Sequence, residues 1–331
     1  MQLEKKSGRG RMQYRKIGKL KKNVSKIIFG TGIDLMCNGS SCNELLDVAF
    51  EKGITTFDTA RVYNLSEKSL GGWIDERENR EEVVIVSKCG HPLKKENRLT
   101  SKEILLDIEN SCKDLKTNYI DILLLHKDHH NAHIDEIVEV LNDLYEKGKI
   151  CCFGASNWSI ERINEANEYA YKNNLQPFSV SSPNFSLVKL NRDPWGGSVS
   201  ISGLDRQQER KWYKENRMPI FAYSSLGSGF LSGKLKYSQI SNISHVLDDR
   251  VVYSYASEEN FERLRRVEIV AQKKSCTCSQ VALAWLLNQE IDVYTITATS
   301  SRHNLQENLL ALDLSLTEKE ILYLDLLSDG Y

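Results

Sequence analysis

The sequence lacks the features that would tie it to a membrane or to the secretory pathway. No apolar run in its 331 residues approaches the ~20 residues needed to span a bilayer. The N-terminus, M-Q-L-E-K-K-S-G-R-G-R, has no apolar core of the kind that a secretory signal carries. We therefore expect no membrane partner and a location in the cytoplasm.

The sequence also lacks an excess of charge of either sign. Its 44 Lys and Arg residues nearly balance 45 Asp and Glu residues, for a formal net charge of −1. Such a chain has no global field that would attract nucleic acid or an anionic membrane surface. We therefore predict no nucleic-acid partner.

Cysteine patterns typical of disulfide frameworks and zinc sites are missing as well. The eight cysteines are scattered, and Cys151 and Cys152 lie inside an apparent buried strand. That position suits small apolar packing better than a disulfide framework. The C-T-C stretch from Cys276 to Cys278 has the wrong spacing for a zinc knuckle.

Short apolar, β-branched runs alternate with helical segments along the chain, a pattern typical of buried parallel strands. The predicted strands end near Phe29, Asp58, Lys88, His126, Ala155, Ser181, Tyr223 and Thr297. The clearest predicted helices span residues 42–52, 101–115, 134–147, 159–172, 258–274 and 279–288. This alternation predicts an α/β fold, a single (β/α)8 TIM barrel over residues 12–331, and a chain of this length can form one. Residues 1–11 are interpreted as an unstructured extension or a remnant of expression.

Polar residues stand where three of these apolar runs end. Asp58 closes I-T-T-F-D, Lys88 closes V-V-I-V-S-K and His126 closes I-D-I-L-L-L-H, while Tyr63 follows Asp58 by five positions. In an α/β barrel, catalytic groups project from the C-terminal ends of the strands. We therefore expect these four side chains to share one face.

Together, the four residue types permit proton transfer by a tyrosine. An unperturbed phenol, with a pKa of roughly 10, is a poor acid and base at neutral pH. A nearby lysine ammonium would stabilise the phenolate, Asp58 would keep that lysine charged, and His126 would orient a carbonyl. The alternatives are that Asp58 and Lys88 form only a structural ion pair and that Tyr63 is a packing residue.

A histidine-rich stretch offers a competing hypothesis. His126, His129, His130 and His133 are close in sequence and would suit a metal-dependent barrel hydrolase. Such barrels draw ligands from several strands, and no second set of ligands completes this one. We therefore predict no metal site and interpret His129, His130 and His133 as solvated loop residues.

The quoted segments resemble a known family. G-I-T-T-F-D-T-A-R-V-Y-N-L-S-E-K-S-L-G, V-S-K, L-L-L-H, G-A-S-N, F-A-Y-S-S-L-G-S-G-F-L-S-G-K and Q-E-N-L are similar to aldo-keto reductases, from about Met12 to Leu327. The resemblance implies a (β/α)8 barrel that uses a nicotinamide cofactor. It also implies a catalytic tetrad, which consists of Asp58, Tyr63, Lys88 and His126. The G-x-G-x-x-G dinucleotide motif is absent, as expected for this fold.

The resemblance also implies the nicotinamide site. Ser156 and Asn157 match residues that bind the carboxamide, although either suits a helix N-cap. Ser182 stands where a glutamine is usual, and Tyr223 matches the aromatic residue that stacks on the ring but could equally be core packing. The cofactor residues expected from the resemblance are Gly30, Thr31, Asp58, Ser156, Asn157, Ser182, Tyr223, Ser224, Leu226, Ser228, Thr299, Ser300, Arg302, Glu307 and Asn308.

The phosphate end of the cofactor site departs from the family pattern. The loop-rich segment 224–255 matches one that covers the pyrophosphate in the family. Ala298 and Asn304 occupy places where basic residues are common, which leaves Arg302 and His303 as the available cations for an adenosine 2′-phosphate. Of the two, an arginine suits a phosphate well. Glu307 and Asn308 match the pair that meets the adenine. We favour NADPH, with NADH as the alternative.

These observations predict an NAD(P)H-dependent oxidoreductase that reduces an aldehyde or ketone, with Tyr63 as general acid. Asn64 and the K-D-H-H stretch replace common family residues, so the substrate stays open, with sugar-like carbonyls among the candidates. The alternative is a nucleotide-binding regulatory or scaffold subunit of the same fold with slow or vestigial catalysis.

Overall fold

The computed structural model describes residues 12–92 and 96–331, and the predicted extension over residues 1–11 lies outside them. Eight parallel strands form a closed barrel in the order β10-β3-β4-β5-β6-β7-β8-β9, which confirms the predicted (β/α)8 fold. The barrel strands are β3 (Ile27–Gly30), β4 (Thr56–Asp58), β5 (Val84–Cys89), β6 (Ile120–Leu125), β7 (Ile150–Ser156), β8 (Ser181–Ser182), β9 (Ile220–Ala222) and β10 (Val293–Thr297). Each of them ends within one residue of its predicted end.

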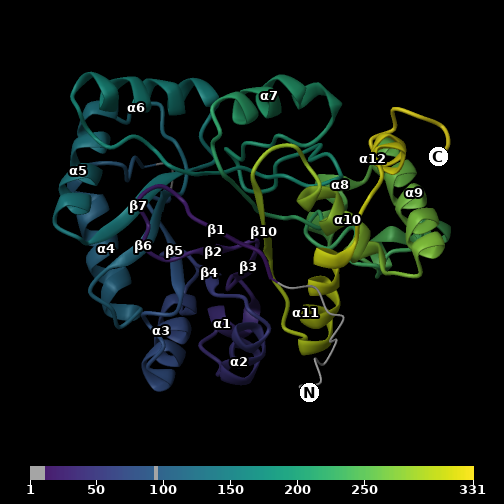
Figure 1. Ribbon diagram of the computed structural model, residues 1–331, viewed down its shortest axis with the longest axis horizontal. Helices are drawn as coiled ribbons and strands as arrows, with labels where there is room; N and C mark the ends of the chain where they lie inside the picture. Colours follow the sequence, from purple (N-terminus) through teal and green to yellow (C-terminus); the bar gives the residue numbers. More distant parts are fainter. Residues whose placement is uncertain (1–11, 93–95) are drawn as a thin grey trace, which may run out of the picture.

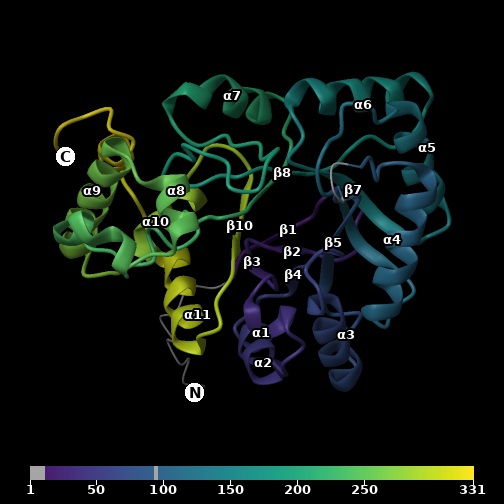
Figure 2. The same ribbon diagram turned by 180° about the vertical axis from the view of Figure 1, so that it is seen from behind.

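Helices surround the barrel, as Figures 1 and 2 show. They are α1 (Asp34–Cys37), α2 (Asn43–Glu51), α3 (Ser66–Arg77), α4 (Ser101–Asp114), α5 (Ile134–Glu146), α6 (Ile160–Lys172), α7 (Gln207–Glu215), α8 (Asp249–Tyr255), α9 (Glu258–Lys274), α10 (Cys278–Leu287), α11 (Arg302–Leu309) and α12 (Glu318–Leu324), with 3₁₀ turns η1 (Leu204–Arg206), η2 (Tyr237–His245) and η3 (Leu310–Asp313). In both views α3 to α6 cover one side of the barrel, and α8 to α10 and α12 gather on the opposite side. The C-terminus lies beside α9 and α12.

The side chains of each strand alternate between the barrel interior and the helical layer. Val84 and Val86 of β5 belong to the interior cluster, while Ile85 between them packs in the outer cluster. This period of two follows from the pleat of a β-strand. Lys88, two residues beyond Val86, is therefore on the inward face at the C-terminal end of its strand.

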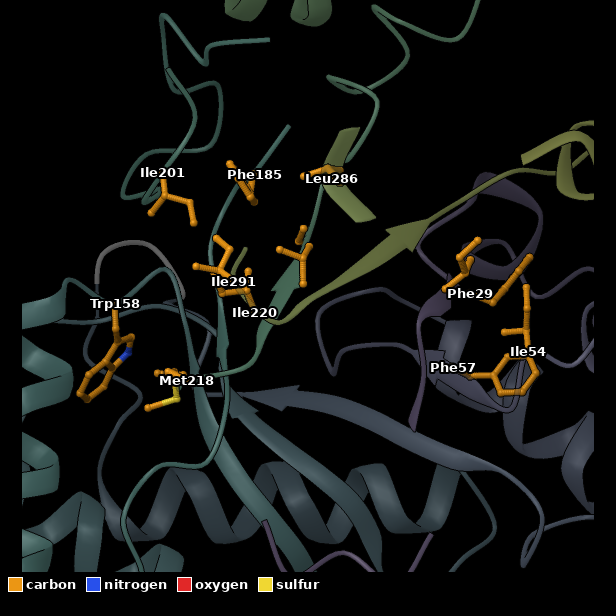
Figure 3. Packing of buried hydrophobic residues seen from close by; sticks show 14 of the residues in the cluster. Phe29, Ile54, Phe57, Trp158, Phe185, Ile201, Met218, Ile220, Leu286 and Ile291 are labelled. Atoms are coloured by element: carbon orange, nitrogen blue, oxygen red, sulfur yellow. The ribbon is translucent and has the colours of Figure 1, made fainter. Parts of the chain in front are cut away.

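The outer cluster joins the barrel to its helices through large aromatic rings. Phe29 and Phe57 have ring centroids 6.1 Å apart, and Phe57 lies 5.1 Å from Trp73 of α3. Figure 3 shows Phe29, Ile54 and Phe57 converging in this layer. Full burial of each such side chain contributes roughly 1.5–3 kcal/mol, so this layer fixes β3 and β4 against α3.

A short antiparallel hairpin closes the other end of the barrel. Its strands are β1 (Tyr14–Arg15) and β2 (Val24–Ser25), and Ile17, Leu20 and Val24 join the interior cluster. The hairpin thus fills the barrel at the end opposite the C-terminal strand ends.

The loop-rich segment predicted at 224–255 is more ordered than expected. It contains η2 and α8, so its interpretation as one long loop was wrong. The residues V-V-Y-S-Y of α8 have low helix propensity, and packing of the buried Val251 and Tyr255 in the outer cluster stabilises the helix instead. Segment 184–203, by contrast, is irregular.

The structure also describes the cysteines, the helices that could cross a membrane and the groups that could bind a metal. All eight cysteines are free thiols and lie within the described residues. Over residues 12–92 and 96–331, no helix is long and apolar enough to cross a bilayer. Within the same ranges, no three or more His, Cys, Asp or Glu side chains gather in a way that could hold a metal ion.

Candidate active site

A buried ion pair lies at the C-terminal ends of β4 and β5. The Nζ of Lys88 donates to both carboxylate oxygens of Asp58, each at 2.7 Å, and to the carbonyl oxygen of Thr59 at 2.9 Å. Both charged residues are only 3% exposed. Burial alone would lower the pKa of Lys88, but the attraction of Asp58 and of Tyr63 outweighs it and raises that pKa. Burial raises the pKa of Asp58 against the opposing effect of Lys88. Lys88 therefore stays a cation at neutral pH.

Tyr63 stands beside this pair on the loop between β4 and α3. The Nζ of Lys88 lies 5.1 Å from the centre of the Tyr63 ring. A Cβ on Gly32 would lie 3.3 Å from Cε2 of Tyr63, so a glycine lets the ring lie close to the backbone. Burial raises the pKa of Tyr63, while Lys88 acts to lower it. The phenol is therefore protonated at neutral pH and can act as a proton donor.

His126 completes the group directly after β6. Its ring lies edge-on to Tyr63 with centroids 5.9 Å apart, and it is 9% exposed. Burial, with repulsion from Lys88, His91 and Lys127, lowers the pKa of His126 well below its ordinary value, so the imidazole is neutral. Its Nδ1 is buried without a hydrogen-bond partner among the described residues. That environment favours the tautomer with the proton on Nε2, because an unpaired buried N–H is costly.

Sequence reasoning missed a second imidazole here. His91 follows β5 by two residues, and its ring lies 4.8 Å from that of His126. Its Nδ1 is 3.0 Å from the carbonyl oxygen of Pro92, and burial lowers its pKa. Its position next to the strand bearing Lys88 is the only sequence signal that could have indicated it.

The residues expected at the nicotinamide lie together at neighbouring strand ends. The Ser156 hydroxyl donates to the carbonyl oxygen of Ser182 at 2.9 Å, and the Ser182 hydroxyl donates to the carbonyl oxygen of Phe221 at 2.8 Å. Both hydroxyl oxygens keep lone pairs that can accept hydrogen bonds. Neither Ser156 nor Asn157 caps α6, because Ser159 does so by accepting from Arg162 N.

The amide of Asn157 is fully used by the protein. Its Nδ2 donates to the carbonyl oxygen of His126 at 3.1 Å and to the Ser156 hydroxyl at 3.2 Å. Its Oδ1 accepts from the Tyr223 hydroxyl at 2.7 Å and from Val199 N at 3.3 Å. Asn157 therefore connects the ends of β6, β7 and β9 to segment 184–203.

The predicted cofactor residues near the ends of β3 and β9 differ in whether their side chains are free to contact a ligand. Thr31 is fully buried and its hydroxyl donates to the carbonyl oxygen of Asp58 at 2.9 Å. A Cβ on Gly30 would lie 3.0 Å from Ile296, so barrel packing accounts for this glycine. After β9, the hydroxyls of Ser224 and Ser228 are 3.1 Å apart in a succession of turns that includes Leu226.

The residues expected at the adenosine end lie on and before α11. Arg302 begins this helix, and its Nη2 pairs with Glu44 of α2 at 2.8 Å, with both side chains more than half exposed. Glu307 accepts from Gln280 of α10 at 3.0 Å, and the neighbouring Asn308 is buried. Thr299 accepts from Ser301 N, and Ser300 lies between them. The pairing with Glu44 was not foreseen.

Comparisons with known proteins bear on this arrangement. The family model described as "Aldo/keto reductase family" matches residues 26–329. The chain is 27% identical to an aryl-alcohol dehydrogenase of Pestalotiopsis microspora, with 86% of this chain and 72% of that protein covered. It is also 27% identical to a putative aryl-alcohol dehydrogenase of Saccharomyces cerevisiae, with 85% of this chain and 84% of that protein covered.

Proposed function

Because the chain belongs to the aldo/keto reductase family of oxidoreductases, we propose that it reduces an aldehyde or ketone to an alcohol with NADPH and with Tyr63 as proton donor. The observation that carries this proposal is the buried Asp58–Lys88 pair beside the half-buried Tyr63. Burying two charges is expensive and often contributes little to stability. A catalytic role at the strand ends accounts for the pair better than a structural one.

The residues present fit a nicotinamide cofactor. The hydroxyl oxygens of Ser156 and Ser182 can accept from a carboxamide NH₂ group, and the half-buried Tyr223 ring offers a stacking surface. Asn157 would have to exchange one of its protein hydrogen bonds to join them. When bound, the reduced nicotinamide supplies the hydride for the carbonyl carbon.

The phosphate end supports NADPH through Arg302. Guanidinium groups suit phosphate because they donate two parallel hydrogen bonds. Arg302 is exposed, and its pairing with Glu44 is a surface ion pair, which is worth little and can be exchanged for a phosphate. NADH remains the alternative if Arg302 stays paired with Glu44 when the cofactor binds.

The four side chains divide the work of proton transfer. The phenolic O–H bond of Tyr63 breaks, and its proton passes to the carbonyl oxygen as the alcohol forms. Lys88 stabilises the resulting phenolate, and Asp58 keeps Lys88 charged and in place. The Nε2–H of neutral His126 positions the carbonyl oxygen by hydrogen bonding.

Parallel titrations with NADPH and NADH, monitored by the quenching of tryptophan fluorescence, test which cofactor binds. The better-bound cofactor is then used in a scan of aldehydes, ketones and sugars. Aryl aldehydes come first because both relatives are named aryl-alcohol dehydrogenases, and sugar-like carbonyls follow from the sequence. Turnover with tight NADPH binding supports the proposal, whereas binding without turnover favours a regulatory subunit.

A further inference from the structure

The residue directly after His126 makes contacts that proton transfer does not require. Lys127 is 9% exposed, and its Nζ donates to the carbonyl oxygens of Trp195 at 2.9 Å and Gly196 at 2.6 Å. Burying an ammonium group is costly unless its protons are bound. The side chain therefore holds segment 193–199 against the end of β6.

Further hydrogen bonds also hold segment 193–199 in place. The carboxylate of Asp193 accepts from Trp195 N at 2.9 Å and from Ser198 N at 2.7 Å. Val199 N donates to Oδ1 of Asn157 at 3.3 Å. Both ends of the segment are thus tied, one internally and one to the active-site residue Asn157.

This arrangement places one large side chain beside the reaction site. The Trp195 ring lies edge-on to Tyr223 with centroids 6.4 Å apart, and Trp195 is 42% exposed. Tyr223 in turn donates to Asn157, which also binds the carbonyl oxygen of His126. Trp195 therefore has an indole surface available to a ligand that approaches the end of the barrel.

We propose that Trp195 is a specificity-determining residue that selects planar aromatic carbonyl compounds, and that Lys127 is the positioning residue that holds it in place. The charged groups of Lys127 and Asp193 are both directed to the backbone of segment 193–199, so they offer little to the hydroxyls of a sugar. The indole of Trp195, the phenols of Tyr63 and Tyr223 and the imidazoles of His91 and His126 remain around the site. Aromatic rings favour offset-stacked or edge-to-face contacts with other aromatic rings. This inference rests on the proposed carbonyl reduction and names its substrate class.

The test compares benzaldehyde with acetaldehyde in Trp195→Ala, Lys127→Met and Lys127→Arg. Loss of one aromatic contact should raise KM for benzaldehyde by about tenfold in Trp195→Ala and Lys127→Met, with kcat and the KM for acetaldehyde within about twofold of wild type. Lys127→Arg should recover most of the loss, because a guanidinium can also donate to two carbonyls. Lys147→Met is the matched control, since Lys147 directly follows α5 and its Nζ pairs with the exposed Asp143 at 2.7 Å.

A second readout does not depend on turnover. Acrylamide quenching of the Trp195 emission, obtained by subtracting the signal of Trp195→Phe, should increase in Lys127→Met and stay at the wild-type level in Lys147→Met. Benzaldehyde should quench the same emission in wild type and about tenfold less effectively in Lys127→Met. If wild type reduces neither aldehyde, the proposed reaction fails for them, and benzaldehyde quenching alone decides the inference. An unchanged benzaldehyde preference in Trp195→Ala, or unchanged quenching in Lys127→Met, overturns it.

Discussion

Replacing Lys88 by methionine should destabilise the fold as well as abolish turnover. The substitution keeps an unbranched side chain of similar length but removes both 2.7 Å contacts to a carboxylate that is 3% exposed. An uncompensated buried charge of this kind costs about 3–5 kcal/mol. Because the ordinary stability of a domain is only about 5–15 kcal/mol, the loss would be a large part of the total.

The cost should depend on pH in a defined direction. Burial raises the pKa of Asp58, and without Lys88 nothing opposes that effect. A raised pKa in the folded state means that the folded protein binds the proton more tightly than the unfolded chain. Lys88→Met should therefore lose least stability below the ordinary pKa of an aspartate, about 3.9, and progressively more as pH rises above it.

Urea denaturation of wild type, Lys88→Met, Asp58→Asn and the double variant measures this coupling. The double variant should be more stable than Lys88→Met, because the buried charge is gone, and the cycle should show coupling of about 1–3 kcal/mol. The reasoning is refuted if Lys88→Met costs less than about 1 kcal/mol at pH 7, or if the two single effects simply add.

Three further predictions concern pH and cofactor choice. The rate of carbonyl reduction should be flat across neutral pH and fall only in the alkaline range, because the pKa of Tyr63 is raised and that of His126 is well below its ordinary value; a limb near pH 7 in the pH–rate profile would contradict this. Burial raises the pKa of Asp325 to about 6. The protonated carboxyl should therefore stabilise the fold fully below about pH 4, and this stabilisation should be lost as pH rises through 6. The free energy of unfolding should fall by about 3 kcal/mol at most over that range. Thermal melts of Asp325→Asn should lack that decrease, and an identical pH dependence would refute the assignment. Glu44→Gln should tighten NADPH binding by about two- to fivefold at low salt and leave NADH binding unchanged, because it frees Arg302; equal effects on both cofactors in fluorescence titrations would exclude the 2′-phosphate role.

The barrel and the gathering of Asp58, Lys88 and His126 at its strand ends were predictable because both follow from local regularities. Apolar runs define the strands, and the strict alternation of a strand decides that Lys88 shares the inward face of Val86. The C-terminal ends of parallel strands then bring Asp58 and Lys88 together, although they are thirty residues apart. Each step needs only neighbouring residues and the known geometry of the fold.

The remaining parts of the site depend on contacts that no local pattern encodes. Lys127 finds its acceptors 68 and 69 residues later in an irregular segment, and Arg302 pairs with Glu44 from the opposite end of the chain. Helix α8 also forms through burial of Val251 and Tyr255 rather than through propensity. These features follow from tertiary packing, which composition and periodicity do not determine.

The central claim is that Tyr63 delivers the proton, and Tyr63→Phe tests it most directly because it removes one oxygen atom and keeps the ring. Steady-state turnover of the best carbonyl substrate should be measured beside the Kd for NADPH, with the exposed Tyr171→Phe as control. The account predicts that kcat falls by about 10²–10⁴-fold, that the Kd stays within about twofold, and that the control behaves as wild type. A Tyr63→Phe enzyme that retains wild-type turnover would contradict the account.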